Sequence, residues 1–276
     1  MEKVFWLSTL GTLYSYIIYP VIMWAVSTFA SKAASPSLPP TDHTISLIIT
    51  AYNEEQRIAQ KIEQTLALNY PRDQLQIIVA SDASDDDTDQ IAGGYSDQGV
   101  LLIRATERLG KEHAQKLAIA QATGDLLVFT DVGTQIESQS LLALEKYFDN
   151  PKIGAVSSTD RMLSHDGTPL GEGLYVRYEM ALRKHESQVS TLVGLSGSFF
   201  AARRQLCAHW NSRIPSDFNT ALNCVRQNLK AISANDVIGI YPDIQDSAKE
   251  YPRKRRTILR GISAVAASTD LLNIFR

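Results

Sequence analysis

Side chains able to bind a nucleotide or a metal ion stand at the ends of three apolar runs: Tyr52 after residues 45–50, Asp82 after 76–80 and Asp131 after 126–130. Short uncharged runs are typical of buried parallel strands, and open α/β sheets bind ligands beyond the carboxyl ends of such strands. The tyrosine offers a stacking surface for a base, whereas the carboxylates suit a ribose hydroxyl and a hard divalent cation. The sequence therefore predicts a nucleotide site at one edge of a parallel sheet.

Each acidic position also has a purely structural interpretation. Asp131 stands where an aspartate commonly caps the helix that follows a strand. Glu54 and Glu55 suit the first turn of a helix, where the helix dipole favours negative charge. Residues 85–87 suit a solvated turn that starts a helix. Each position taken alone is explained in this way, and only their combination favours ligand binding.

Strands and helices alternate along residues 44–251. We expect strands at 45–50, 76–80, 100–103, 125–130, 153–157, 194–202 and 237–241, and helices at 54–68, 111–122, 140–148, 172–189 and 218–229. This alternation predicts an α/β fold with a doubly wound, mostly parallel sheet. Dinucleotide-binding oxidoreductases share that fold class, but no Gly-x-Gly-x-x-Gly follows the first expected strand.

Five short motifs occur in a defined order: Ala-Tyr-Asn-Glu-Glu at 51–55, Ser-Asp-Ala-Ser-Asp at 81–85, Gly-Lys at 110–111, Phe-Thr-Asp at 129–131 and Ser-Gly-Ser-Phe-Phe-Ala at 196–201. As an ordered set they resemble the motifs of family 2 glycosyltransferases, over roughly residues 45–261. The resemblance implies the nucleotide-sugar-binding (GT-A-like) α/β fold. It also implies inverting transfer of a hexose or N-acetylhexosamine from a nucleotide-diphosphate sugar to an acceptor hydroxyl.

The resemblance implies roles for individual residues, with donor contacts at Ala51, Tyr52, Glu54, Asp82, Lys111, Gly197 and Arg256. Asp131 would hold Mg²⁺ or Mn²⁺, which stabilises the charge that develops on the leaving diphosphate. Asp217, at the expected start of a helix, would accept the proton of the attacking hydroxyl. Two structural alternatives stay open, because Asp217 suits a helix N-cap and Lys111 a solvated side chain in a first helical turn.

Gly133 departs from the family pattern, which is Asp-x-Asp where this chain has Asp131-Val132-Gly133. Glycine has no side chain to bind a cation, so one expected ligand is missing. A Mg²⁺ ion tolerates the loss when water and donor phosphates complete its shell, which is the interpretation we favour. The alternative is a catalytically silent relative that acts as a scaffold in a polysaccharide synthesis or export complex.

Composition restricts the partners. The net charge of −3 and the isoelectric point near 6.0 argue against a nucleic-acid binder. Cys207 and Cys224 lack the spacing of a metal site, and both are expected to be reduced thiols. The expected partners are therefore a nucleotide-sugar donor, above all a UDP-sugar, and a lipid-linked or saccharide acceptor at a membrane.

The N-terminus predicts a membrane anchor, because residues 4–30 contain no charge and are long enough as a helix to cross a bilayer. A cleaved signal peptide is the alternative, although the apolar stretch is longer than such peptides usually carry. We expect a transmembrane helix at 1–30, a linker rich in proline and serine at 31–43, and a catalytic domain at 44–251. This predicts a single-pass protein of the cell inner membrane with its catalytic domain in the cytoplasm.

The C-terminal segment 252–276 is expected to be a basic helix at the membrane interface. Residues 253–256 read Arg-Lys-Arg-Arg, with Arg260 one turn later, and charges interrupt the apolar residues of 258–275. Such a cluster attracts either a diphosphate or anionic lipid head groups. Interrupted apolar character is typical of a helix that lies on a membrane rather than one that spans it.

Overall fold

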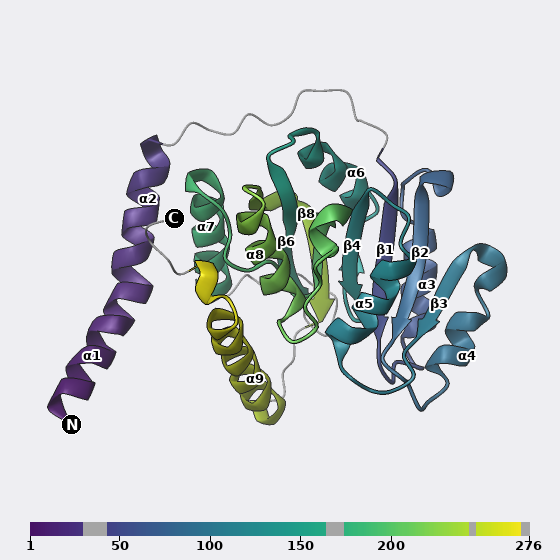
Figure 1. The fold of residues 1–276 in the computed structure, drawn as a ribbon, viewed down its shortest axis with the longest axis horizontal. Helices are drawn as coiled ribbons and strands as arrows, with labels where there is room; N and C mark the ends of the chain where they lie inside the picture. Colours follow the sequence, from purple (N-terminus) through teal and green to yellow (C-terminus); the bar gives the residue numbers. More distant parts are fainter. Residues whose placement is uncertain (30–42, 164–173, 243–246, 272–276) are drawn as a thin grey trace.

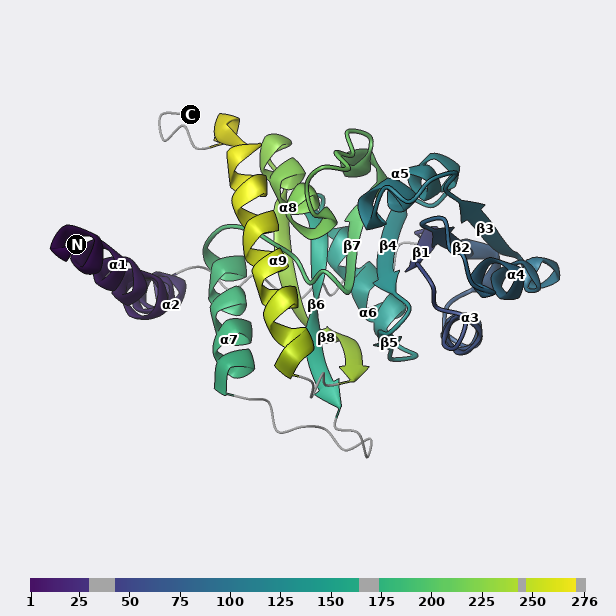
Figure 2. The same cartoon turned by 90° about the horizontal axis from the view of Figure 1, so that it is seen from below.

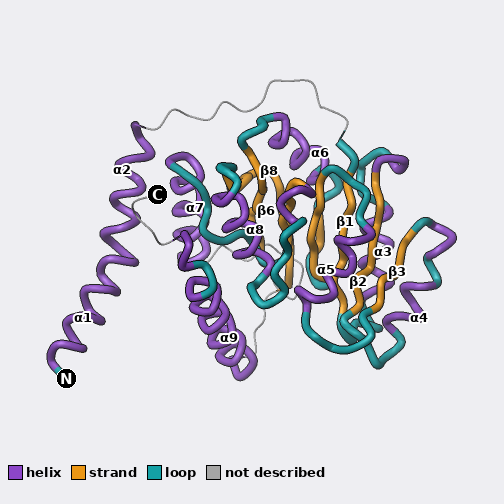
Figure 3. Tube along the Cα trace, viewed as in Figure 1, coloured by secondary structure: helices purple, strands orange, loops and turns teal. Residues whose placement is uncertain are grey.

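The computed structural model describes residues 1–29, 43–163, 174–242 and 247–271 (Figure 1). The predicted linker at 31–43 lies outside the described residues, except for its last residue, His43. A central sheet is covered by helices on both faces, and the N-terminal helix stands beside it (Figures 1 and 3).

Eight strands form one sheet in the described part of the chain, in the order β3-β2-β1-β4-β7-β6-β8-β5. Their bounds are β1 (Ile45–Ala51), β2 (Leu75–Ser81), β3 (Val100–Arg104), β4 (Leu126–Asp131), β5 (Gln135–Ile136), β6 (Ile153–Leu163), β7 (Phe199–Arg203) and β8 (Lys230–Pro242). The first half of the sheet is parallel, whereas β7 runs antiparallel to both of its neighbours, β4 and β6. The predicted α/β fold is confirmed, with antiparallel strands that the sequence pattern did not indicate.

Helices cover both faces of the sheet, as a doubly wound fold requires. Their bounds are α3 (Ile58–Leu66), α4 (Thr88–Gly93), α5 (Lys111–Gln121), α6 (Ser140–Glu145), α7 (Leu174–Val189), α8 (Ser216–Arg226) and α9 (Ser247–Ala266), with 3-10 turns η2 (Arg72–Gln74), η3 (Ser96–Gln98), η4 (Lys146–Asp149), η5 (Arg204–Cys207) and η6 (Thr269–Leu271). One core lies between the sheet and α3, α4 and α6, and a second between the sheet and α5 and α8. Alternate residues of each parallel strand therefore enter different cores, which explains why these strands are apolar throughout.

The N-terminal helix consists of α1 (Glu2–Leu13), a π-helical turn η1 (Tyr14–Ile18) and α2 (Tyr19–Phe29). Over its 28 residues it is long and apolar enough to cross a membrane. No residue of α1 is buried, whereas α2 contacts α7 (Figure 1). Two polar bonds join these helices, from the Tyr19 hydroxyl to Glu186 (2.8 Å) and between Ser27 and His185 (2.7 Å). The second half of the apolar helix is thus attached to the folded domain.

Helix α9 begins earlier than the sequence pattern predicted. It runs without interruption across the boundary that we placed between residues 251 and 252, and it lies beside α8 (Figure 2). Four of its large apolar side chains are exposed: Ile258, Leu259, Ile262 and Val265. The helix therefore has one apolar surface that the described residues of the domain do not cover.

Candidate functional site

The polar groups predicted at the strand ends are neighbours in the sheet. Strand β1 pairs with both β2 and β4, with Thr50 opposite Asp131, and the Asp82 N–H donates to the Ala51 carbonyl (2.9 Å). The Asp131 N–H donates to the Ser198 carbonyl (3.2 Å), which places the 196–198 segment beside the end of β4. Four of the five sequence motifs thereby meet at one edge of the sheet.

Lys111 brings the fifth motif to the same place. Its ammonium group lies 2.5 Å from the Asp131 carboxylate and donates to the Gly197 carbonyl at 2.7 Å. Lys111 is the first residue of α5, and Gly110 before it has φ = +100°, a conformation that favours glycine. The Gly-Lys motif thus combines the turn that enters the helix with a cation directed at the end of β4.

Asp82 is buried and holds this turn in place. Its carboxylate accepts the backbone N–H groups of Leu109 (3.1 Å) and Gly110 (3.0 Å to each oxygen). A carboxylate that accepts two backbone N–H groups is well satisfied without a ligand. The geometry gives Asp82 a positioning contact with this turn, and its contact with the donor stays a prediction.

Asp217 also lies next to Gly197 at this site. It is the second residue of α8, and a Cβ atom added to Gly197 would lie 3.7 Å from its Oδ2 atom. Burial raises the pKa of the Asp217 carboxyl, although the N–H of Phe218 and the charge of Lys111 oppose that shift. The residue before the helix is Pro215, so Asp217 is a first-turn carboxylate and not a helix N-cap, the structural alternative.

Two of the predicted donor contacts have cations of the protein as neighbours. The Arg108 guanidinium lies over the Tyr52 ring, 3.8 Å from the ring centroid, on a surface that we had assigned to a base. Glu54 forms a 2.6 Å ion pair with Arg57. Ala51 is buried and contributes its carbonyl to Asp82.

Arg256 belongs to α9, but its side chain lies outside the described residues. Arg260, one turn later, bonds to Glu112 in the first turn of α5, beside Lys111. Helix α9 therefore places a basic side chain next to the site. The sequence had grouped Arg260 with residues 253–256 as one basic cluster.

The surroundings of Asp131 do not resemble a divalent cation site. Among the described residues, no three His, Cys, Asp or Glu side chains are grouped so that they could hold a metal ion. A Cβ atom added to Gly133 would lie 3.5 Å from Arg57 Nη1, so a guanidinium lies next to the position where the family pattern has its second carboxylate. With Lys111 on the one carboxylate that remains, the residues present do not fit the metal that we predicted.

A buried lysine lies behind Asp131. The Lys61 ammonium donates to the Thr130 hydroxyl (3.0 Å) and the Thr134 carbonyl (2.5 Å). Burial lowers its pKa to about 7, although the charge of Asp131 acts in the opposite direction. Sequence reasoning missed this residue, yet a signal existed, because Lys61 falls on the same helix face as Ile58 and Ile62.

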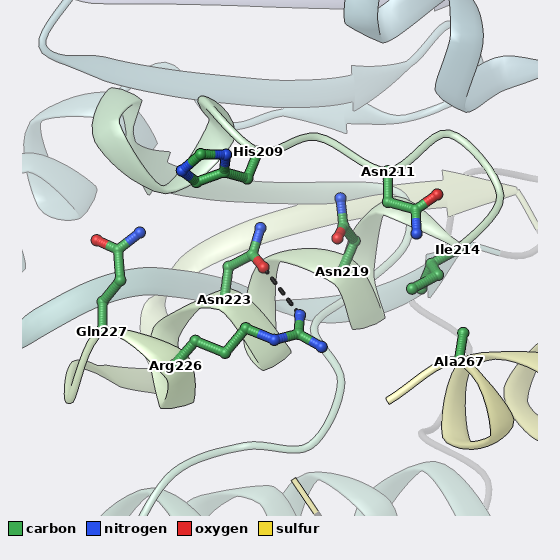
Figure 4. Close-up of a pocket in the computed structure, with 8 residues that line it drawn as sticks. All are labelled: His209, Asn211, Ile214, Asn219, Asn223, Arg226, Gln227 and Ala267. Carbon is green, nitrogen blue, oxygen red and sulfur yellow. Dashed lines mark hydrogen bonds between the residues drawn. The ribbon is translucent and has the colours of Figure 1, made fainter. Parts of the chain in front are cut away.

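A separate cavity of about 580 Å³ lies between α8, the segment after η5 and the end of α9 (Figure 4). It is lined by His209, Asn211, Ile214, Asn219, Asn223, Arg226, Gln227 and Ala267. Arg226 is held by Asp270 (3.0 Å) and by Asn223 (3.1 Å). None of the site residues predicted from the sequence lines this cavity.

Comparison with known proteins supports the fold and the motifs. Residues 46–209 match the family model of Glycosyl transferase family 2. The Drosophila melanogaster dolichyl-phosphate beta-glucosyltransferase is 35% identical over 114 residues, which cover 38% of this chain and 33% of that protein. The beta-monoglucosyldiacylglycerol synthase of Synechocystis sp. is 27% identical over 187 residues, which cover 63% of this chain and 38% of the synthase. The chain thus matches about a third of the length of these curated relatives.

A solved structure shares the fold over almost the whole chain. The mannosyltransferase PcManGT from Pyrobaculum calidifontis, in complex with GDP-Man and Mn²⁺, aligns with a TM-score of 0.77 and 22% sequence identity. The alignment covers 95% of this chain and 74% of that one. This likeness shows the nucleotide-sugar-binding α/β fold.

Proposed function

Because the chain belongs to Glycosyl transferase family 2, we propose that it transfers a sugar from a nucleotide-diphosphate sugar to an acceptor hydroxyl, with inversion at the anomeric carbon. One observation carries the proposal. The raised-pKa carboxyl of Asp217 and the ammonium of Lys111 both lie close to Gly197, beyond the end of β4. A base for the acceptor and a cation for the leaving group are both needed in such a transfer.

The reaction assigns one step to each group. The acceptor oxygen attacks the anomeric carbon while its proton passes to the Asp217 carboxylate. The bond from that carbon to the diphosphate oxygen breaks, and its electron pair leaves with the diphosphate. The Lys111 ammonium is suited to neutralise that developing charge. Asp82 positions Lys111 by holding the turn at Gly110.

The proposed donor is a UDP-sugar, which fits Tyr52 as a stacking surface once Arg108 moves to the phosphates or stacks over the base. The proposed acceptor is lipid-linked or a growing saccharide. The relatives support this acceptor class by their names, since one acts on dolichyl phosphate and another makes a glucosyldiacylglycerol product. Contacts of Ala51, Glu54 and Arg256 with the donor remain part of the proposal.

A divalent cation belongs to the family expectation, and the PcManGT structure is a complex with GDP-Man and Mn²⁺. In a transferase that binds one, Mg²⁺ or Mn²⁺ stabilises the leaving diphosphate. Asp131 is the residue that would hold it here, but Lys111 is paired with Asp131 and Arg57 lies beside Gly133. No step of the proposed reaction therefore passes through a metal ion.

We place the chain at the cell inner membrane as a single-pass protein with its catalytic domain in the cytoplasm. The N-terminal apolar helix and the exposed apolar side chains of α9 support this location. A charged nucleotide sugar made in the cytoplasm would then reach the site without crossing the membrane.

The test is a panel of nucleotide sugars and nucleoside diphosphates added to the purified full-length chain in detergent. A nucleotide that binds the folded chain raises the melting temperature, by an amount that grows with the logarithm of its concentration above the dissociation constant. We expect a shift with at least one nucleotide and release of its diphosphate from the matching sugar donor. The absence of both across the panel would contradict the proposal.

Gly133 motivates a second candidate, a catalytically silent scaffold in a polysaccharide complex. The two candidates differ in their need for Asp217. If polymer synthesis in cells that lack the chromosomal gene is restored equally by the wild-type chain and by Asp217→Asn, the scaffold is supported. If only the wild-type chain restores it, the transferase is supported.

A further inference from the structure

We infer that this chain binds the donor diphosphate with its own cations at Asp131, chiefly Lys111, in the place of a divalent metal ion. The inference rests on the proposed function and identifies how that site binds its substrate. It differs from the sequence prediction, which assigned Mg²⁺ or Mn²⁺ to Asp131.

Lys111 carries the first part of the argument. Its ammonium is 2.5 Å from Asp131 Oδ1 and 2.7 Å from the Gly197 carbonyl, so two oxygens hold it over the end of β4. A metal ion bound to the same carboxylate would lie within about 2.0–2.6 Å of its oxygens. Two cations at such a short distance repel each other strongly. Lys111 and a metal ion would therefore compete for one carboxylate.

Arg57 carries the second part. The family pattern has a carboxylate at position 133, whereas this chain has glycine and places Arg57 Nη1 3.5 Å from the site of the missing Cβ atom. Arg57 also forms an ion pair with Glu54, three residues earlier. The position of a negative metal ligand is thus empty here and lies next to a guanidinium.

Arg108 adds a cation at the adjacent strand end. It lies over Tyr52, directly after β1, and β1 is the neighbour of β4 in the sheet. Guanidinium and ammonium groups form short, charge-assisted hydrogen bonds with phosphate oxygens. Lys111, Arg57 and Arg108 therefore offer to a diphosphate the charge that a metal ion would otherwise supply.

The same contact serves the transfer step. When the bond from the anomeric carbon to the diphosphate breaks, the electron pair stays on the phosphate oxygen, and the acceptor proton goes to Asp217. Lys111 would then share its hydrogen bonds between Asp131 and the new phosphate charge. Asp131 acts here as a positioning residue for Lys111.

The first test is calorimetric titration of the full-length chain in detergent with UDP and GDP, in excess EDTA and again in Mn²⁺ or Mg²⁺. We expect dissociation constants that agree within about twofold between EDTA and metal. Binding that requires the metal would overturn the inference and leave the proposed function standing. Binding of neither nucleotide under any condition would overturn both.

Variants of Lys111 test the residue itself. In EDTA, Lys111→Met is expected to weaken nucleotide binding at least tenfold, whereas Lys111→Arg keeps the charge and most of the affinity. Lys116→Met, an exposed lysine on the same helix, is the control for net charge. Equal affinity of Lys111→Met and wild type in EDTA would overturn the inference.

Gly133→Asp gives an independent test, since it restores the family pattern without removing a cation. The added carboxylate would pair with Arg57 and offer a second metal ligand beside Asp131. We expect weaker nucleotide binding in EDTA and recovery on addition of Mn²⁺. If Gly133→Asp binds the nucleotide in EDTA as tightly as the wild type does, and Mn²⁺ does not change that affinity, the role assigned to these cations is contradicted.

Discussion

Asp217 and Lys111 approach Gly197 from different helices, and this small arrangement determines what the site can do. Asp217 is held near a cation, yet burial keeps the pKa of its carboxyl above the usual range. A carboxylate of raised pKa is a better proton acceptor near neutral pH. This property of Asp217 predicts both the rate of sugar transfer and the dependence of that rate on pH.

Asp217→Asn is expected to lower the transfer rate by about 10²–10⁴-fold, because an amide accepts no proton, while nucleotide affinity changes little. The wild-type rate should fall on the acid side at a higher pH than an ordinary aspartate would give, since protonated Asp217 is inactive. Steady-state rates from pH 4 to 8 and a nucleotide titration measure these effects. A variant with wild-type turnover would rule out Asp217 as the base.

Sequence alone identified Asp131, Lys111, Gly197 and Asp217 as candidates, and the fold brings these four together. The contacts between them could not be predicted from the sequence, because the Lys111–Asp131 pair joins the start of a helix to the end of a strand 20 positions away. Nor did the sequence mark Arg57 and Arg108 as site residues, since basic residues in loops are usually solvated. The metal prediction followed the family pattern and did not include the Arg57 guanidinium beside Gly133.

Among the secondary-structure elements, the contact between the end of β2 and the turn that starts α5 determines where the Lys111 side chain points. Asp82 follows β2 and accepts the backbone N–H groups of the turn that starts α5. Asp82→Asn replaces Oδ2 with an amide NH2 group, so the Gly110 N–H loses one of its two bonds and faces another donor. We expect a loss of about 1–3 kcal/mol in the free energy of unfolding and weaker nucleotide binding.

Urea unfolding and nucleotide titration of Asp82→Asn measure that prediction. Asp97→Asn, on the exposed turn η3, provides a control that should behave like wild type. If Asp82→Asn loses donor affinity without any loss of stability, Asp82 contacts the donor directly, as the sequence had suggested.

Lys61 gives helix α3 a pH-dependent contribution to stability. Its pKa is about 7 in the folded chain and 10.5 as an ordinary lysine, so the unfolded chain binds more protons between these values. Rising pH therefore favours the folded wild-type chain over that interval. The unfolding free energy of wild type minus that of Lys61→Met is expected to rise by up to about 1.4 kcal/mol per pH unit from pH 7 to 10.

Urea titrations at pH 7, 8.5 and 10 measure this difference. Lys116→Met, which removes an exposed lysine, should show no such slope relative to wild type. A difference that stays flat or declines with pH for Lys61→Met would contradict the buried-lysine assignment.

Most elements were predictable, and the deviations have physical causes. Helix α3 begins at Ile58 rather than at Glu54, because the 54–57 segment forms turns tied to the 85–88 loop. Strands β6 and β8 are longer than their apolar runs because they pair with each other over most of their length. The periodicity of apolar residues indicates which positions are buried, whereas the pairing of β6 with β8 depends on contacts between residues distant in sequence.

At the scale of the whole molecule, the N-terminal helix and α9 determine how the site would face a membrane. The free half of the helix, α1, is exposed along its length, while α2 is attached to α7. A spanning helix puts its two ends on opposite sides of the bilayer. The location we propose therefore predicts different accessibility at Glu2 and in the folded domain.

Cysteine labelling of spheroplasts measures this accessibility. The native Cys207 and Cys224 are buried, so little background is expected. Ser96→Cys, on an exposed turn of the domain, should react with a membrane-impermeant maleimide only after detergent is added, whereas Glu2→Cys should react before it. Reaction of both positions in intact spheroplasts would contradict a cytoplasmic domain.

The central claim is inverting transfer from a nucleotide sugar, and the most direct test is proton NMR of the first sugar formed. Incubation of the full-length chain with an α-linked nucleotide sugar allows water to act as acceptor when no other is present. Our account predicts that the β anomer appears first and that Asp217→Asn forms it at least about 10²-fold more slowly. Initial release of the α anomer, or equal release by both proteins, would contradict it.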